Sequence, residues 1–259
     1  MELRARLRKI VLDILGITAR PKSGIHILNG HMLHRLCPDE EAREMFEVLL
    51  ATLKEWVTYV RIEDAVRMIC RHEQPDMPLV AFTFDDGFEE CFTGIAPVLE
   101  KFGINGMFFI NPGFVTGDEG YIKNFTEHVV LTPGKRPMNW EQIADLQRRG
   151  HIIGAHTMDH YMINDSDLTK LDYQIGFCKS VIEQKLKVPC DYFAFPYGRL
   201  EHANPAAIEI ATRYYKYVFS QSDYKHYFSF GGKVINRRHF EPFWPVNHVR
   251  YFLSSRKTY

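Results

Sequence analysis

The stretch LVAFTFDDGFEECFTGIAPVLEKFGINGMFFIN, residues 79–111, decides the fold of this chain. It begins with a short apolar run, 79–84, whose length and aromatic content indicate a buried strand. An amphipathic segment that ends at Gly103 then predicts a helix, and a second apolar run, stopped by Pro112 and Gly113, predicts another strand. A strand, a helix and a strand in this order are typical of a parallel pair with a helical crossover.

The same alternation continues along the chain. Further strands are expected at 24–28, 151–156, 190–198, 216–221 and 233–240, and helices at 39–57, 61–71, 138–150, 167–186 and 204–215. Only 113–137 breaks the pattern, as a polar and irregular insertion of the kind that is often functional. The alternation predicts an α/β fold with a parallel sheet, either open and doubly wound or closed as a barrel, and the lack of a linker favours one domain.

Composition narrows the classes of partner. The 259 residues carry 32 basic and 32 acidic side chains, so no basic field supports binding to nucleic acid or to an anionic membrane. The five cysteines are widely spaced without a CxxC pair, which is typical of a reducing compartment, and no secretory signal pattern is visible. We therefore expect a cytoplasmic protein that does not bind nucleic acid.

Residues 1–23 are expected to form an amphipathic helical segment ahead of a single domain at 24–259. Its apolar residues Leu7, Ile10, Val11, Ile14 and Leu15 recur at helical spacing among charges. Packing on its own domain is the commoner fate of such a helix, and peripheral attachment to the inner face of the membrane is the alternative. No apolar run approaches the ~20 residues that span a bilayer.

Chemically active residues follow several predicted strands. They are His31, Asp85, Asp86, Asn111, His156 and Tyr197. Because the carboxyl ends of parallel strands meet at one edge of a sheet or one mouth of a barrel, we expect these side chains to converge.

The segment HTMDH, residues 156–160, carries the strongest chemical signal. Two histidines four residues apart share one face of a helical turn, so both imidazoles can reach one metal ion. Either Asp85 or Asp86 can complete a set of two histidines and one carboxylate, which suits a catalytic divalent metal, and the other can accept a proton from an activated water. The alternatives are a solvated turn for the histidines and a helix-capping turn for Asp86.

Three motifs together resemble a known family. TFDDG at 83–87, HTMDH at 156–160 and FAFPYG at 193–198 are similar in order and spacing to those of the polysaccharide deacetylases of carbohydrate esterase family four, the chitooligosaccharide deacetylase homology domain. ILNGHMLHR at 27–35 resembles the opening of the exopolysaccharide branch. The resemblance implies a distorted (β/α) barrel of about seven parallel strands. It also implies metal-dependent hydrolysis of an N-acetyl group on an aminosugar of a polysaccharide, an oligosaccharide or a precursor.

The resemblance also implies roles by motif position. Asp85 would be the general base, and Asp86, His156 and His160 would bind the metal. Zinc is the default for such ligands, with cobalt and nickel as alternatives.

Other roles concern the oxyanion and the substrate. By resemblance, the backbone N–H of Tyr197 would stabilise the oxyanion, Pro196 would hold that turn, and Thr157 would brace the histidine loop. We expect Tyr161 near the substrate because it directly follows a ligand histidine and because sugar rings stack on aromatic faces.

The chain departs from the family pattern in two places. Many members carry an arginine before the Pro-Tyr-Gly turn to orient the base, and this chain does not. Arg237 or Arg238 on the last strand can supply the charge, and Arg238 is the residue that we assign to the site.

The family's late Leu-x-His motif, which provides the general acid, is also not evident. We expect His31 to donate the proton because it follows the first strand, with His128 and His248 as alternatives.

Other functions stay open on the sequence alone. One is a deformylase or deacylase acting on an amide of a lipid-linked or nucleotide-linked sugar. Another is a catalytically silent carbohydrate-binding domain, although a complete metal set argues against it. A glycoside hydrolase that uses Asp85 and Asp86 is disfavoured, because adjacent strand residues point to opposite faces.

Overall fold

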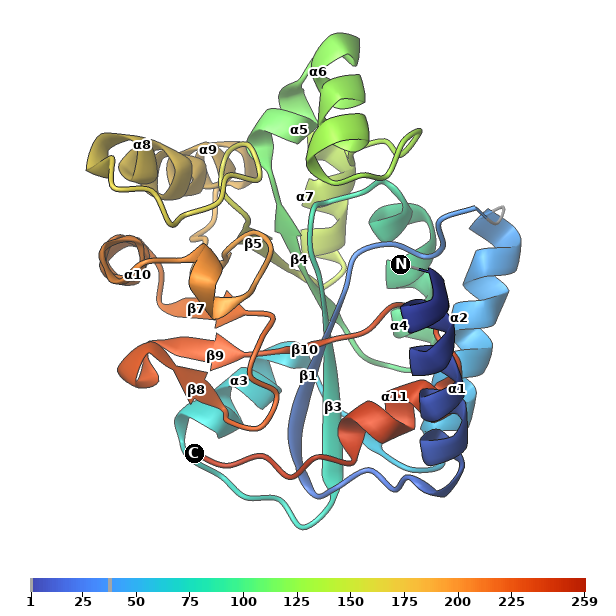
Figure 1. Cartoon of the computed structure of the whole chain (residues 1–259). Helices are drawn as coiled ribbons and strands as arrows, with labels where there is room; N and C mark the ends of the chain where they lie inside the picture. The colour runs from blue at the N-terminus through green and yellow to red at the C-terminus, as the bar shows by residue number, and fades with distance from the viewer. Residues whose placement is uncertain (1, 37–38) are drawn as a thin grey trace.

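The computed structural model describes residues 2–36 and 39–259 and shows a sheet surrounded by helices (Figure 1). In the described residues, the sheet has ten strands. Nine of them follow the order β10-β1-β3-β4-β5-β6-β7-β9-β8, and the tenth, β2, pairs with β3. The strands are β1 Gly24–Gly30, β2 Thr58–Tyr59, β3 Pro78–Phe84, β4 Gly106–Ile110, β5 Ile152–Ala155, β6 Tyr192–Ala194, β7 Tyr217–Ser220, β8 Phe228–Ser229, β9 Val234–Asn236 and β10 Arg238–His239. All neighbouring pairs are parallel except β8 with β9.

The last strands curl the sheet into a deformed barrel. β9 pairs with β7 towards one end of the strand order, and β10 pairs with β1 at the other end. A single residue, Arg237, separates β9 from β10. The chain therefore crosses from one side of the sheet to the other at Arg237, and the expected distorted (β/α) barrel is confirmed.

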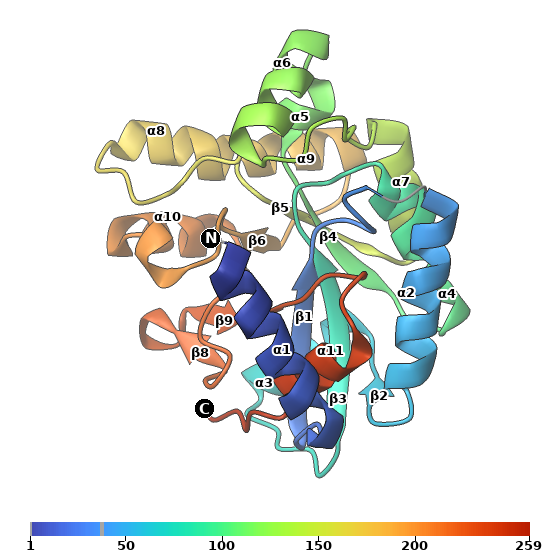
Figure 2. The ribbon, with the colours of Figure 1, turned by 45° about the vertical axis from the view of Figure 1, so that its right-hand side comes forward.

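Helices cover the outside of this barrel, and α1 lies across α11 (Figure 2). The α-helices are α1 Glu2–Thr18, α2 Asp39–Leu53, α3 Ile62–Cys70, α4 Ala96–Lys101, α5 Pro112–Thr116, α6 Glu119–Asn124, α7 Trp140–Arg148, α8 Leu168–Asp172, α9 Cys178–Leu186, α10 Pro205–Tyr214 and α11 Val246–Leu253. Within the described residues, no helix has both the length and the apolar character that a bilayer crossing requires. The division into a segment at 1–23 and a domain at 24–259 stays a prediction.

The burial of strand β3 explains why residues 79–84 are apolar apart from Thr83. Val80, Phe82 and Phe84 belong to the apolar cluster under the covering helices, whereas Leu79 and Ala81 belong to the cluster with the interior strand residues and α3. Both faces of the strand are therefore buried, as in other parallel sheets. Because side chains alternate along a strand, the face that begins at Leu79 and Ala81 continues through Thr83 to Asp85.

Two expected elements differ from the structure. The insertion at 113–137 is largely helical, because α5, α6 and a π-helical turn at Phe125–Val129 bury an apolar cluster in which Phe114 and Phe125 stack. The long helix expected at 167–186 is helical from Leu168 to Leu186 but contains a π-helical turn at Tyr173–Phe177. There Gly176 lies so close to Tyr214 that a Cβ atom would meet its ring at 2.5 Å.

Candidate active site

The carboxyl ends of the strands surround a cavity of about 300 Å³. Of the residues expected at this mouth, five line the cavity: His31, Asp85, Asp86, His156 and Tyr197. Asn111 instead donates hydrogen bonds to the backbone carbonyls of His156 and Thr157. Other lining residues are Met32, Arg35, Val129, Val130, Leu131, Thr132, His160, Gln221, His239 and Glu241.

Asp86, His156 and His160 bring three donor atoms together. Oδ1 of Asp86 lies 3.5 Å from Nε2 of His156 and 3.3 Å from Nε2 of His160, and all three residues are buried. Nδ1 of His156 lies 2.7 Å from the carbonyl oxygen of Ala194. Because a carbonyl oxygen can only accept a hydrogen bond, Nδ1 of His156 carries the proton. Its Nε2 atom therefore presents a lone pair towards Asp86 and His160.

The surroundings of this trio fit a bound cation. Oδ1 of Asp86 is buried without a hydrogen-bond donor among the described residues, and a bare carboxylate oxygen is costly there. Burial raises the pKa of Asp86 to about 7, so this carboxylate lacks a sufficient positive neighbour within the chain. Burial lowers the pKa of His156 to about 4 and holds that of His160 well below its usual range. Both imidazoles are therefore neutral at neutral pH and able to coordinate a metal.

The two histidines belong to a loop and not to the expected helical turn. Residues 156–160 have no helical assignment, and Thr157 and His160 take left-handed backbone angles of φ +62° and +55°. Such angles are rare outside glycine and persist only where surrounding contacts enforce them. Here the N–H of Gly113 donates to the carbonyl of Met158 at 2.9 Å, and Oγ1 of Thr157 accepts from the N–H of Tyr161 at 2.8 Å.

Asp85 lies in a different environment from Asp86. Its two carboxylate oxygens accept from Nη1 and Nη2 of Arg237 at 2.8 and 2.9 Å, and Oδ2 also accepts from Nδ2 of Asn29 at 2.9 Å. Burial alone would raise the pKa of Asp85, but the Arg237 guanidinium outweighs burial and holds that pKa well below its usual range. Asp85 is therefore ionised and fixed in orientation.

Arg237, and not Arg238, supplies the charge beside Asp85, so the assignment of Arg238 to the site is wrong by one residue. Arg237 is fully buried, whereas the Arg238 guanidinium lies 3.7 Å from the ring centre of Tyr224 and 4.1 Å from that of Phe252. The reason is the crossing between β9 and β10, where successive side chains point to opposite faces and only Arg237 enters the barrel.

His31 forms a second cluster with Glu241 and His239. Nδ1 of His31 lies 2.7 Å from Oε1 of Glu241, whose Oε2 accepts from the backbone N–H of His31 at 3.1 Å. Nε2 of His239 lies 3.0 Å from the same Oε1 atom. Burial lowers the pKa of His31, but the Glu241 carboxylate more than offsets this and raises it to about 9. His31 is therefore protonated at neutral pH.

The Pro-Tyr-Gly turn also borders the cavity. Pro196 is buried, and Tyr197 follows it in the left-handed region at φ +63°. The ring of Tyr197 packs edge-on against that of His160, with centroids 4.7 Å apart. The N–H of Gln221 donates to the carbonyl of Gly198 at 2.7 Å, which ties the turn to the end of β7.

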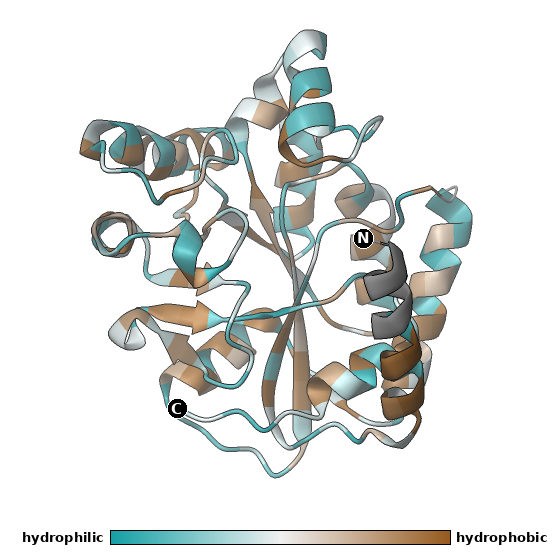
Figure 3. Cartoon of the chain, viewed as in Figure 1, coloured by the Kyte–Doolittle hydropathy of each residue, from teal (hydrophilic) through white to brown (hydrophobic). Residues whose placement is uncertain are grey.

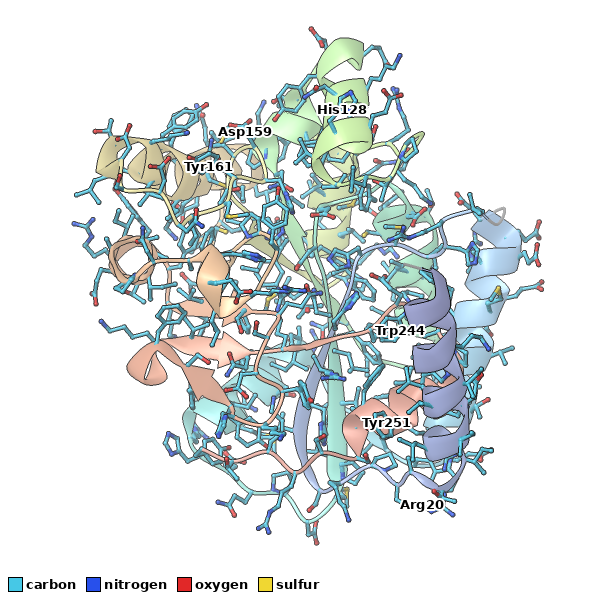
Figure 4. The ribbon with its side chains drawn as sticks, viewed as in Figure 1. Arg20, His128, Asp159, Tyr161, Trp244 and Tyr251 are labelled. Atoms are coloured by element: carbon cyan, nitrogen blue, oxygen red, sulfur yellow. The ribbon has the colours of Figure 1, made fainter. Side chains whose placement is uncertain are left out.

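Three expected or alternative residues do not line the cavity, and Figure 4 labels two of them, Tyr161 and His128. Tyr161 does not line the cavity: its hydroxyl bonds to Asp165 and its ring lies under Lys170, and its contact with a substrate stays a prediction. His128 lies on the outer helical insertion, and His248 bonds to Asp13 at 2.7 Å.

Sequence reasoning missed Glu241, His239 and Asn29. The alternation in RRHFE places His239 and Glu241 on one face of an extended segment, which is a usable signal for a pair. Nothing in the sequence brings Asn29 and Glu241, 212 positions apart, to the same cavity, because that depends on β10 pairing with β1.

Comparisons with known proteins bear on the family and the fold of the chain. A family model described as polysaccharide deacetylase matches residues 72–215. YxkH of Bacillus subtilis (strain 168), provisionally named a polysaccharide deacetylase, is 22% identical over 147 residues, which cover 57% of this chain and 47% of YxkH. The chain therefore matches about half the length of that curated relative.

Two solved structures share the fold. IcaB from Ammonifex degensii has a TM-score of 0.70 and 22% identity, over 92% of this chain and 100% of that structure. The Streptococcus pyogenes deacetylase PplD, solved with acetate, has a TM-score of 0.67 and 19% identity, over 90% of this chain and 99% of that structure. The family match spans more than half of the 259 residues and includes the aspartate pair, both histidines and the Pro-Tyr-Gly turn. On that match, the chain belongs to the polysaccharide deacetylase family.

Proposed function

We propose that the protein is a metal-dependent carbohydrate deacetylase that hydrolyses an N-acetyl group on an aminosugar of a polysaccharide, an oligosaccharide or a precursor. One observation carries the proposal. The unpaired, buried Oδ1 of Asp86 faces two neutral imidazoles in a cavity that also holds an ionised carboxylate, Asp85, and a protonated imidazole, His31. A cation site, a base and an acid in one cavity suit amide hydrolysis.

Asp86, His156 and His160 would hold the metal, with zinc the first choice and cobalt or nickel as alternatives. A divalent cation there would supply Lewis acidity towards the amide carbonyl and would acidify the attacking water. We assign the backbone N–H of Tyr197 as a hydrogen-bond donor to the oxyanion, in addition to the cation. The turn that contains Tyr197 borders the cavity beside His160.

Asp85 accepts the proton of the attacking water in this mechanism. Arg237 fixes its orientation but also keeps its pKa low, so Asp85 is an adequate base only towards a strongly acidified water. This requirement links the base to the cation site.

His31 donates a proton to the leaving nitrogen. Glu241 holds Nδ1, which leaves the N–H at Nε2 for the substrate. The water oxygen bonds to the acetyl carbon, the C–N bond breaks, and the nitrogen takes the proton. The products are acetate and a free amine on the sugar.

The cellular location stays a prediction. Cys70, Cys91, Cys178 and Cys190 are free thiols, which supports a reducing compartment, and Cys37 lies outside the described residues.

Acetate release tests the proposal. The protein is incubated with N-acetylated oligosaccharides and with lipid-linked and nucleotide-linked N-acyl sugars, with added zinc, cobalt or nickel and with a chelator. We expect acetate from at least one N-acetylated substrate, loss of activity with the chelator, and loss in Asp85→Asn. Activity that survives chelation would contradict the mechanism, and release of formate or a longer acid alone would favour a different deacylase.

A further inference from the structure

Helix α1 is fixed to the rest of the protein along one face. Leu12 and Gly16 are buried, and Gly16 lies so close to α11 that a Cβ atom would meet the backbone oxygen of Asn247 at 2.4 Å. Oδ1 of Asp13 bonds to Nε2 of His248 at 2.7 Å. Nη2 of Arg250 donates to the carbonyl of Ala19 at 2.7 Å. These contacts set the rotation of the helix and therefore decide which side chains face outward.

The outward side of α1 is apolar. It consists of Ile10, Val11, Ile14, Leu15 and Ile17, which are between 44% and 68% exposed and which we call the apolar face of α1. Figure 3 shows the described turns of α1 as a hydrophobic segment beside more mixed helices. At 100° per residue, these five positions cover one continuous side, opposite Leu12 and Gly16. A continuous apolar surface of this kind marks an interaction site more often than scattered exposed residues do.

Basic residues are concentrated around the same helix. Residues 1–22 contain six basic side chains, Arg4, Arg6, Arg8, Lys9, Arg20 and Lys22, against two acidic ones, Glu2 and Asp13. Asp13 is occupied by His248 and by Lys9 at 2.9 Å. The whole chain has no net charge, so the net charge of all 259 residues does not reveal the positive charge that is concentrated in residues 1–22.

We propose that α1 docks on an anionic membrane surface, with its apolar face between the lipid head groups and with the net positive charge of residues 1–22 attracting it to their phosphates. An apolar face with flanking arginine and lysine is the combination that interfacial helices use. A second copy of the chain is the less favoured occupant, because pairing two such helices would bring like charges together. The inference uses none of the cavity residues, so it stands or fails independently of the proposed function.

Vesicle co-sedimentation tests this inference on the full chain. The protein is mixed with vesicles of phosphatidylcholine alone, and of phosphatidylcholine with about 30% phosphatidylglycerol. We expect binding to the anionic vesicles to be about tenfold stronger and to weaken as salt increases. The single variant Ile14→Ser should bind less well than the native protein, and the triple variant Ile10→Ser/Ile14→Ser/Ile17→Ser should bind less well than the single variant.

Matched controls test whether the loss of binding is specific to the apolar face of α1 or follows from the loss of any exposed apolar side chain. Val48→Ser on α2 and Leu168→Ser on α8 replace side chains of similar exposure, 64% and 57%, and should bind vesicles as the native protein does. Circular dichroism and acetate release of the α1 variants should be unchanged, because the replaced side chains face outward.

Three results would overturn the proposal. The first is equal binding to both kinds of vesicle at all salt concentrations, and the second is native-like binding by both α1 variants. The third is that the native protein does not bind vesicles and is a dimer in light scattering, whereas the triple variant is a monomer. The last result would assign the apolar face to a second copy of the chain.

Discussion

At the scale of single residues, two adjacent aspartates have opposite surroundings. Asp85 receives three hydrogen bonds from Arg237 and Asn29, whereas Oδ1 of Asp86 receives none within the described residues. The first carboxylate is already neutralised by the protein, and the second still requires a positive partner. This difference, which no pattern in TFDDG contains, supports the division into a base and a metal ligand.

Arg237→Met should lower both activity and stability, because it leaves the buried Asp85 charge unpaired. We expect a loss of about 3–5 kcal/mol of unfolding free energy and of at least about 100-fold in kcat, measured by urea denaturation and acetate release. Arg238→Met is the matched control and should change kcat little. The double variant Arg237→Met/Asp85→Asn should recover stability but not activity; equal instability of the double and single variants would contradict the pairing.

Glu241→Gln should change the pH dependence. In the native protein, Glu241 raises the pKa of His31 to about 9, so the acid is lost only as the pH rises through that value. The same pair should stabilise the fold fully between about pH 4.5 and 6.5, progressively less as the pH rises to about 9, and less again as it falls to about 2, where Glu241 is protonated. Without the carboxylate, the alkaline limb of kcat should move to lower pH, since burial lowers this pKa and only the Asp85 and Asp86 charges then oppose it.

The control for this prediction is His239→Gln, which keeps the bond between His31 and Glu241. Its alkaline limb should stay near that of the native protein. An unchanged profile in Glu241→Gln would exclude His31 as the proton donor.

At the scale of elements, the histidine loop depends on contacts from a distant helical turn. Oε1 of Gln174 accepts from the N–H of Asp159 at 3.1 Å, and its Nε2 donates to Oδ2 of Asp159 at 2.8 Å. The carbonyl of Gln174 also accepts from the N–H of Met158 at 3.1 Å. Gln174 therefore holds the part of the loop between the two histidines.

Gln174→Ala should weaken metal binding roughly tenfold or more, because the loop loses the side-chain contacts that orient His156 and His160. Metal titration with a fluorescent competitor measures the affinity. Gln184→Ala on α9 replaces an exposed glutamine and is the control. Unchanged affinity in Gln174→Ala would show that other contacts, such as those of Asn111, suffice to hold the loop.

The same elements show what the sequence can predict. Short apolar runs in the sequence predicted β1, β3, β4, β5, β6 and β7. This is possible because a strand that is buried on both faces appears in the sequence as a run of mostly apolar residues. The loop at 156–160 was expected to be a helical turn because the His-x3-His spacing fits one. Its left-handed residues are enforced by Gly113, Asn111 and Gln174, which lie far away in sequence.

At the scale of the whole molecule, closure of the barrel assembles the site. β9 and β10 pair with opposite parts of the sheet, and this crossing brings Arg237 to Asp85 and Glu241 to His31. The sequence predicted a parallel sheet and the residues at its strand ends. It could not choose between Arg237 and Arg238, since that choice depends on where the sheet closes and on which face each side chain enters.

The central claim is that Asp86 binds a catalytic metal while Asp85 acts as the base beside it. The most direct measurement is the bound divalent metal per chain, by elemental analysis, together with acetate release for the native protein, Asp86→Ala and Asp85→Asn. We predict that Asp86→Ala loses both metal and activity, and that Asp85→Asn keeps the metal and loses activity. Equal loss of metal in both variants, or full activity in either, would contradict the account.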